Sequence, residues 1–263
     1  MLKRLKKLEF LLTGDINNEK YHRNLEFSKM KNLSEEIKRY LLEQGASIVG
    51  FADLNELPLY DRYGYRYGIS FGIALRPEAI KAIFPGPSIV YYNEYIGVSD
   101  RLYNLAELGA NFLKSKGIDA LPLTKSNVVK EDSVFRSKLP FKTVATRAGL
   151  GWIGKCAFLV TEQFGPALRL GVILTNDQLD TGKPINNSRC GKCEECKRMC
   201  PAGGVSGKNW RVGVDRDELL NAKACKAAVV ERGKKLNELT EGTCGLCIWA
   251  CPWTQKYLKR ANC

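Results

Sequence analysis

Cysteine spacing is the strongest chemical feature of this sequence. Cys190, Cys193, Cys196 and Cys200 follow the spacing C-x2-C-x2-C-x3-C, and Pro201 comes directly after them. This spacing is typical of chains that hold two cubane iron–sulfur clusters, in which three thiolates bind one cluster and the fourth binds the other. The run therefore predicts a site for two [4Fe-4S] clusters.

A second run, spaced C-x2-C-x3-C-P, supplies further ligands, and one more cysteine lies between the two runs. Exchange of the last cysteine of each run then assigns eight ligands. The first predicted set is Cys190, Cys193, Cys196 and Cys251, and the second is Cys200, Cys225, Cys244 and Cys247. Structural zinc also binds paired C-x2-C runs and is an alternative. A disulfide framework, typical of small secreted domains, is a weaker alternative.

Two cysteines, Cys156 and Cys263, remain outside these sets. Cys156 is expected in the core, and Cys263 is the last residue of the sequence.

Composition narrows the classes of function. The 263 residues carry a net charge of +13 and a single histidine, His22, so chemistry that needs a histidine base is nearly excluded. No apolar run is long enough to span a bilayer, and Glu9 interrupts the short apolar stretch after the basic start. Reduced thiolates favour a cytoplasmic protein. The positive charge would attract nucleic acid, an acidic cofactor or an acidic partner protein.

The elements that must position the cysteines precede them. Strand-like and helical patterns alternate over residues 33–125, which predicts an α/β (α+β) domain with a mixed sheet covered by helices. We expect a basic N-terminal arm or helix at 1–31, the α/β domain at 32–180, and a ferredoxin-like domain with two clusters at 181–263. Residues 215–232 have helical character and contain Cys225.

A glycine-rich segment lies between the two predicted domains. Gly149, Gly151 and Gly154 form a literal G-x-G-x-x-G, but the strand-like run 156–161 follows where a dinucleotide-binding fold needs a helix. We therefore reject a nicotinamide or flavin dinucleotide site. The glycines either make a tight connection or let a flat, bulky group approach the backbone.

The same segment carries a resemblance to a known family. Gly50-Phe-Ala52, Arg147-Ala-Gly-Leu-Gly-Trp-Ile-Gly-Lys155, Phe164-Gly-Pro166 and the two cysteine runs together resemble epoxyqueuosine reductase. More distantly, they are similar to the corrinoid- and iron–sulfur-containing reductive dehalogenases.

The resemblance implies an oxidoreductase of tRNA modification and queuosine biosynthesis. Such a chain would hold cobalamin in the α/β domain and pass electrons from the clusters to it, in order to remove the epoxide oxygen of epoxyqueuosine in tRNA. By position, Lys155, Leu159, Gly165 and Pro166 would line the corrin pocket. An external electron donor of the ferredoxin or flavodoxin type and tRNA would be the partners, with no membrane.

Two departures from the family pattern leave an alternative open. The family's acidic proton donor corresponds to Phe135, with Asp132 and Glu131 upstream as weak candidates for the acid and Tyr91, Tyr92 and Tyr95 as further hydroxyl groups. The sequence ends at Cys263, so the resemblance implies a short form without the C-terminal helical-repeat extension. The alternative is an electron-transfer or corrinoid-activating iron–sulfur protein with no organic substrate of its own. A redox-sensing nucleic-acid binder is a third interpretation, based on charge.

Overall fold

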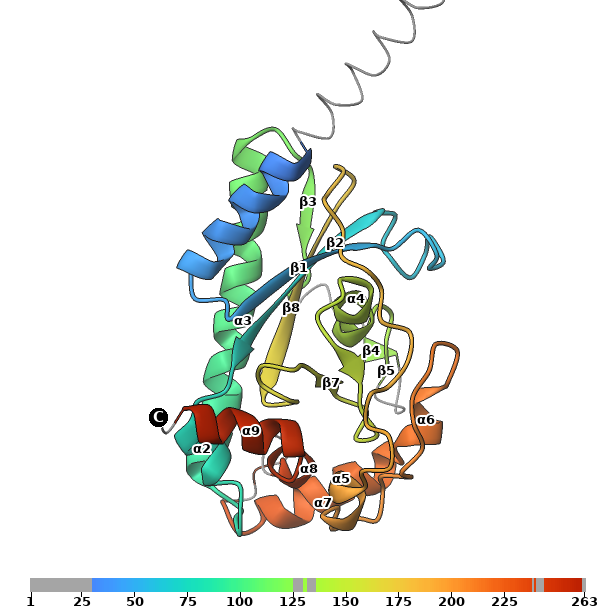
Figure 1. The fold of residues 1–263 in the computed structure, drawn as a ribbon. Coiled ribbons are helices and arrows are strands. Elements are labelled where there is room, and N and C mark those ends of the chain that lie inside the picture. Colours follow the sequence, from blue (N-terminus) through green and yellow to red (C-terminus); the bar gives the residue numbers. More distant parts are fainter. Residues whose placement is uncertain (1–29, 125–129, 132–135, 238, 240–243, 262–263) are drawn as a thin grey trace, which may run out of the picture.

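The computed structural model describes residues 30–124, 130–131, 136–237, 239 and 244–261 (Figure 1). The predicted basic arm at 1–31 lies almost wholly outside these residues and stays a prediction. Within the described ranges, none of the helices combines the length and apolar character needed to cross a bilayer.

A four-stranded sheet forms the centre of the molecule. Its order is β1 (Ile48–Asp53), β2 (Tyr67–Ala74), β8 (Leu168–Thr175) and β3 (Ala120–Pro122). Each neighbouring pair is antiparallel, so the expected mixed sheet is wrong in strand direction, although the α/β character is confirmed. The physical reason is that β2 and β3 run the same way, joined by a helical crossover, and β8 inserts between them from much later in the chain.

Helices cover both faces of this sheet. The helix at 30–43 and α3 (Ile89–Ser115) lie on one face, and α4 (Phe141–Arg147) lies on the other (Figure 1). Side chains alternate along β2 accordingly: large residues such as Phe71 join the core under α3, and small residues such as Gly68 face α4. A Cβ on Gly68 would lie 2.7 Å from Val144 in α4, so the glycine allows this close approach.

The glycine-rich segment connects α4 to a small hairpin. The hairpin is made by β6 (Trp152–Ile153) and β7 (Leu159–Val160), so a helix precedes the glycines and a strand follows them. The observation on which we rejected a dinucleotide-binding site, that no helix follows the glycines, is therefore confirmed. A Cβ on Gly151 would lie 2.2 Å from the Val160 carbonyl oxygen, which shows that the glycine serves close packing of the chain on itself.

The cysteine-rich part is built of short helices joined by turns. The remaining elements are α2 (Pro77–Lys81), β4 (Lys130–Glu131), β5 (Arg136–Ser137), α5 (Glu195–Arg198), α6 (Arg216–Leu219), α7 (Ala222–Gly233), α8 (Leu246–Trp249) and α9 (Pro252–Arg260). The expected helical character of 215–232 is confirmed, with a break at Leu220 between α6 and α7.

The last two helices join the core of the sheet. Leu246, Ile248 and Leu258 belong to the same buried cluster as Phe71 and the inner side of α3. The Tyr257 hydroxyl donates a hydrogen bond of 3.0 Å to the Leu75 carbonyl oxygen. The predicted boundary at 180–181 stays a prediction, but apolar packing is continuous across it.

Candidate metal centre and adjoining cavities

The second predicted cysteine set surrounds one small cavity of about 30 Å³, named here the cysteine cavity. It is lined by Cys200, Cys225, Cys244, Cys247 and Cys156, together with Phe158, Pro201, Ala202, Val205, Leu220 and Ala228. The four predicted ligands come from the end of α5, the first turns of α7 and the start of α8. The backbone N–H of Gly204 donates to the Cys200 sulfur at 3.3 Å, a contact that favours a thiolate.

The first predicted set lies against the glycine-rich segment. Cys190 and Cys251 pack with Trp152, and Trp152 meets Trp253 edge-on at 5.4 Å. Cys251 is the N-cap of α9, while Cys190 precedes α5, so two distant stretches of chain meet here. The aromatic pair shields this side of the set from water.

Cys156 lies between the two sets. Its thiol is buried and hydrogen-bonded to Cys196 of the first set, and it also lines the cysteine cavity of the second. The expectation of a buried thiol is confirmed, but its neighbours are cysteines as well as apolar side chains.

The arrangement leaves space between the sulfurs. In the part of the chain that the structure describes, no three His, Cys, Asp or Glu side chains are close enough to share a single metal ion. A cavity bounded by cysteine sulfurs suits a larger inorganic group that each sulfur meets at a separate corner.

The four residues expected to hold a corrin ring are not gathered at one cavity. Lys155, Gly165 and Pro166 are buried, and a Cβ on Gly165 would lie 2.5 Å from the Thr254 nitrogen, so this glycine packs against α9. Leu159 alone of the four lines a larger space, of about 340 Å³.

This larger space, named here the Phe158 cavity, adjoins the cysteine cavity through the side chain of Phe158, which lines both. Its walls are lined by Tyr103, Ser137, Pro140, Phe141, Lys142, Ala157, Phe158, Leu159, Arg169 and Leu170. Arg169 stacks on the Tyr95 ring at 3.8 Å, and its Nε is buried without a hydrogen-bond partner among the described residues. The cavity is thus largely apolar, with the guanidinium of Arg169 and the side chain of Lys142 on its walls.

A third space, of about 320 Å³, lies between α4 and α6 and is named here the junction cavity. Lys142 lines both this cavity and the Phe158 cavity. Burial, and secondarily the charge of Arg216, lowers the pKa of Lys142 to about 8. Sequence reasoning missed this lysine, because a lysine in a helix with an ordinary pattern does not signal burial.

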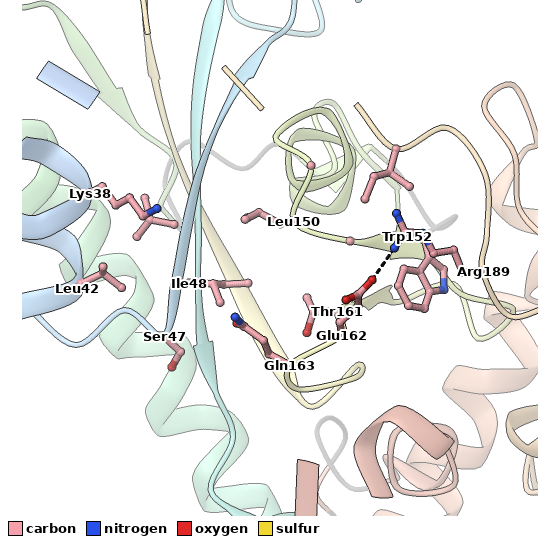
Figure 2. Close-up of a pocket in the computed structure, with 14 residues that line it drawn as sticks. Lys38, Leu42, Ser47, Ile48, Leu150, Trp152, Thr161, Glu162, Gln163 and Arg189 are labelled. Carbon is pink, nitrogen blue, oxygen red and sulfur yellow. Dashed lines mark hydrogen bonds and ion pairs between the residues drawn. The ribbon is translucent and has the colours of Figure 1, made fainter. Parts of the chain in front are cut away.

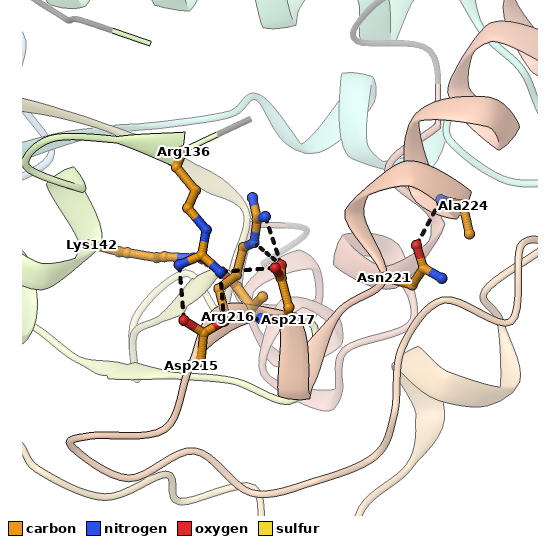
Figure 3. Close-up of polar contacts among 8 residues, drawn as sticks. Arg136, Lys142, Asp215, Arg216, Asp217, Asn221 and Ala224 are labelled. Carbon is orange, nitrogen blue, oxygen red and sulfur yellow. Dashed lines mark hydrogen bonds and ion pairs between the residues drawn. The ribbon is translucent and has the colours of Figure 1, made fainter. Parts of the chain in front are cut away.

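Ion pairs close the junction cavity. Arg136 binds Asp215 through both terminal nitrogens, at 2.9 and 2.8 Å, and reaches Asp217 at 2.8 Å (Figure 3). The Arg136 guanidinium, together with a backbone N–H, lowers the pKa of Asp215 to about 2. Arg147 is buried and pairs with Glu56 at 2.5 Å. The contacts of Arg136 with Asp215 and Asp217 tie the α/β part to the cysteine-rich part.

The predicted acids are not placed by the structure. Asp132 and Phe135 lie outside the described residues, and for Glu131 only the backbone, in β4, is described. Of the tyrosines, Tyr91 is buried, and burial followed by the charge of Cys247 raises its pKa. Tyr91 is therefore held in its neutral form beside the second cysteine set.

A further cleft, of about 520 Å³, lies on the outer side of β1 (Figure 2). Residues of the helix at 30–43, of β1 and of the glycine-rich segment line it. Glu162 and Arg189 form an ion pair of 2.5 Å beside Trp152 on one wall. None of the predicted cluster or corrin ligands lines this cleft, although Gly149 and Gly151 of the glycine-rich segment do.

Comparisons with solved structures define the class of fold. A selenomethionine-labelled epoxyqueuosine reductase aligns with 85% of this chain and 66% of its own, at 20% identity and a TM-score of 0.58. A catabolic reductive dehalogenase aligns with 89% of this chain and 34% of its own, at 17% identity and a TM-score of 0.66. At such identities the likeness shows the fold alone, which is one that these two kinds of reductase share.

Sequence relatives include epoxyqueuosine reductases of several bacteria. Epoxyqueuosine reductase of Atelocyanobacterium thalassa is 28% identical over 130 residues, which are 46% of this chain and 39% of the relative. That of Lactococcus garvieae is 31% identical over 119 residues, or 43% and 31% of the two chains. No family model matches the sequence. The resemblance to epoxyqueuosine reductases is therefore confirmed, over well under half of those relatives' length.

Proposed function

We propose that this chain is an iron–sulfur oxidoreductase that reduces epoxyqueuosine to queuosine in tRNA. The observation that carries the proposal is the cysteine cavity, where four cysteines from separate helices surround one space beside a larger cavity. The sequence relatives named epoxyqueuosine reductase support the choice of substrate. A solved relative described in complex with an epoxyqueuosine-modified tRNA stem-loop supports tRNA as the partner.

Two [4Fe-4S] clusters are the first cofactors proposed. Cys200, Cys225, Cys244 and Cys247 would hold one, and Cys190, Cys193, Cys196 and Cys251 the other. The donor set is all thiolate, the ligand type that such clusters require. The contact between Cys156, which lines the cysteine cavity, and Cys196 supports a short distance between the two proposed clusters, which suits transfer of electrons between them.

Cobalamin is the second cofactor proposed, and the likeness to epoxyqueuosine reductases supports it. Of the residues expected to line the corrin pocket, Leu159 lies at the Phe158 cavity, whose volume of about 340 Å³ suits a small organic group and not the whole cofactor. When bound, cobalamin supplies a strongly reducing metal centre that the clusters can charge. Phe141, Phe158 and Leu170 of this chain would exclude water from the Phe158 cavity.

The test is anaerobic reconstitution followed by turnover. The purified chain, supplied with iron, sulfide and cobalamin, should contain about eight irons and one stoichiometric cobalt. With a low-potential reductant it should convert an epoxyqueuosine-bearing tRNA stem-loop to the product that lacks one oxygen atom, measured by nucleoside mass spectrometry. A reconstituted chain that binds cobalt and leaves the stem-loop unchanged would contradict the proposed substrate.

The electron-transfer alternative is favoured by one sequence observation, the phenylalanine at the position of the family's acid, Phe135. That alternative predicts about eight irons, no cobalamin uptake and rapid reduction of a partner's cofactor. Zinc in place of iron would contradict both functions. The salt dependence of stem-loop binding separates the tRNA enzyme from the electron carrier, because phosphate contacts release counterions.

A further inference from the structure

We propose that Lys142 is the proton donor of this reduction and that it protonates the oxygen leaving a substrate bound in the Phe158 cavity. The inference rests on the proposed function. It concerns a residue that neither the cysteine spacing nor the family resemblance assigns.

Placement is the first argument. Lys142 lies in the first turn of α4, on the wall that the Phe158 cavity shares with the junction cavity. Its Nζ donates a hydrogen bond of 2.8 Å to the carbonyl oxygen of Ala157, which also lines the Phe158 cavity. An ammonium group has three N–H donors, so this bond orients the group and leaves two for a ligand.

The neighbouring charges are the second argument. Each of the two carboxylates that line the junction cavity is engaged by an arginine. Asp215 pairs with Arg136 (Figure 3), and Glu56 pairs with Arg147. Lys142 has no carboxylate partner among the residues that the structure describes. The ionisable groups lining the two cavities around it are Glu56, Tyr103, Arg136, Arg147, Arg169, Asp215 and Arg216.

The resulting acidity is the third argument. Burial and the charge of Arg216 bring the pKa of Lys142 to about 8, while Cys156 acts weakly in the opposite direction. A general acid works best when its pKa is near the working pH, because it is then protonated and still able to release its proton. An ordinary lysine, at about 10.4, holds the proton too tightly.

The chemistry then balances. Conversion of an epoxide to an alkene breaks both carbon–oxygen bonds, consumes two electrons and two protons, and releases one water. The electrons come from an external one-electron donor of low potential. The Lys142 ammonium gives one proton to the departing oxygen and becomes a neutral amine, solvent gives the second proton, and solvent then reprotonates the amine.

The departure at Phe135 agrees with this assignment. A phenylalanine at the position of the family's acid removes one source of protons, and Lys142 lies seven positions later, at the start of the helix that borders the cavity. The phenylalanine at position 135 and the half-buried Lys142 together indicate that an ammonium group replaces the family's carboxylic acid as proton donor.

The test has one arm without turnover and one with it. In the first, lysines of the intact reconstituted chain are labelled with trace amine reagent over a range of pH, and peptides are quantified by mass spectrometry. Labelling of Lys142 should have a midpoint at about pH 8, and labelling of the exposed Lys114 serves as the control for reagent access. In the second, turnover of the modified stem-loop is measured for the wild type, Lys142→Arg, Lys142→Met and Lys114→Met.

The expected result is a loss of about 10²–10⁴-fold in turnover for both Lys142 variants, with iron content, cobalt content and stem-loop affinity unchanged. The wild-type rate should fall as the pH rises through about 8. Lys114→Met should match the wild type.

The contrary outcomes are distinct. An active wild type with an equally active Lys142→Met overturns this inference alone, as does a labelling midpoint at the ordinary value. Lys142→Arg with full activity would assign Lys142 a purely electrostatic role and also overturn it. A wild type that binds its cofactors but leaves the stem-loop unchanged overturns the proposed function and this inference together.

Discussion

The cysteine cavity and the Phe158 cavity share the side chain of Phe158 and are assembled in different ways. Most of the cysteine cavity comes from residues 200–247, whereas the Phe158 cavity collects residues from α3, β5, α4, the β6–β7 hairpin and β8. The first is bounded by sulfur and apolar atoms, and the second combines apolar walls with Lys142 and Arg169. The comparison teaches that cysteine spacing in the sequence specifies the proposed cluster site, whereas tertiary structure specifies the proposed substrate cavity.

The largest effect should come from the cysteines, and it tests the first half of this comparison. Cys225→Ala removes a predicted ligand and should lower the iron content from about eight to about four. Cys156→Ala, at the same cavity, should leave about eight irons, because Cys156 is not a predicted ligand. Iron analysis and EPR after anaerobic purification provide the measurement. If the two variants exchange behaviour, Cys156 is the fourth ligand and the spacing rule fails at that position.

A smaller effect should follow from disturbing the wall between the cavities. Gly151→Ala places a Cβ 2.2 Å from the Val160 carbonyl oxygen, so the β6–β7 hairpin that carries Phe158 must shift. We expect a loss of about 1–3 kcal/mol in the free energy of unfolding. The matched control is Gly97→Ala, where a Cβ in α3 would meet nothing within 4 Å. That variant should gain about 0.5–1 kcal/mol from helix propensity, and a loss of similar size in both variants would contradict the packing argument.

The third effect concerns the stability cost of the half-buried Lys142. Because the fold lowers the pKa of Lys142, the unfolded chain binds more protons between about pH 8 and the ordinary lysine value, and stability rises with pH there. Lys142→Met should therefore be more stable than the wild type at pH 7, by about 2–4 °C in Tm, and the difference should shrink above about pH 8. Thermal unfolding at several pH values measures it. A difference that is constant with pH would show that the charge of Lys142 carries no such cost.

The smallest effect should come from the exposed ion pairs that join the two parts. Arg136→Gln should let the pKa of Asp215 return from about 2 toward its ordinary value, because the guanidinium is the main cause of the shift. Since the fold lowers this pKa, the stabilising effect is present at neutral pH and lost as the pH falls through about 2. We expect a change of less than about 1 kcal/mol at neutral pH, as for other exposed pairs. NMR titration of the Asp215 carboxyl would detect the shift, and an unchanged titration would contradict it.

Features that depend on residues close together in the sequence could be predicted from the sequence. The cysteine spacing grouped four side chains that line the cysteine cavity together with Cys156, and the succession of strand-like and helical patterns over residues 33–125 indicated the α/β character. The insertion of β8 between β2 and β3 could not be predicted in this way, because strand order depends on contacts between residues far apart in the chain. The same holds for Lys142 and Arg169, whose sequence neighbours give no sign that they line one cavity. The corrin residues carried over by resemblance remain a prediction, with Leu159 alone placed at the Phe158 cavity.

The packing of α8 and α9 into the sheet core has a consequence for maturation of the protein. Cys247 lies in α8 and Cys251 directly precedes α9, while Leu246, Ile248 and Leu258 of these helices complete the core beneath α3. The proposed ligands and the core residues thus alternate along one short stretch, which would couple loading of the proposed clusters to closure of the apolar interior. In a cell short of iron, newly made chains would retain an open C-terminal segment that proteases recognise, and the supply of metal would set the abundance of the protein as well as its activity.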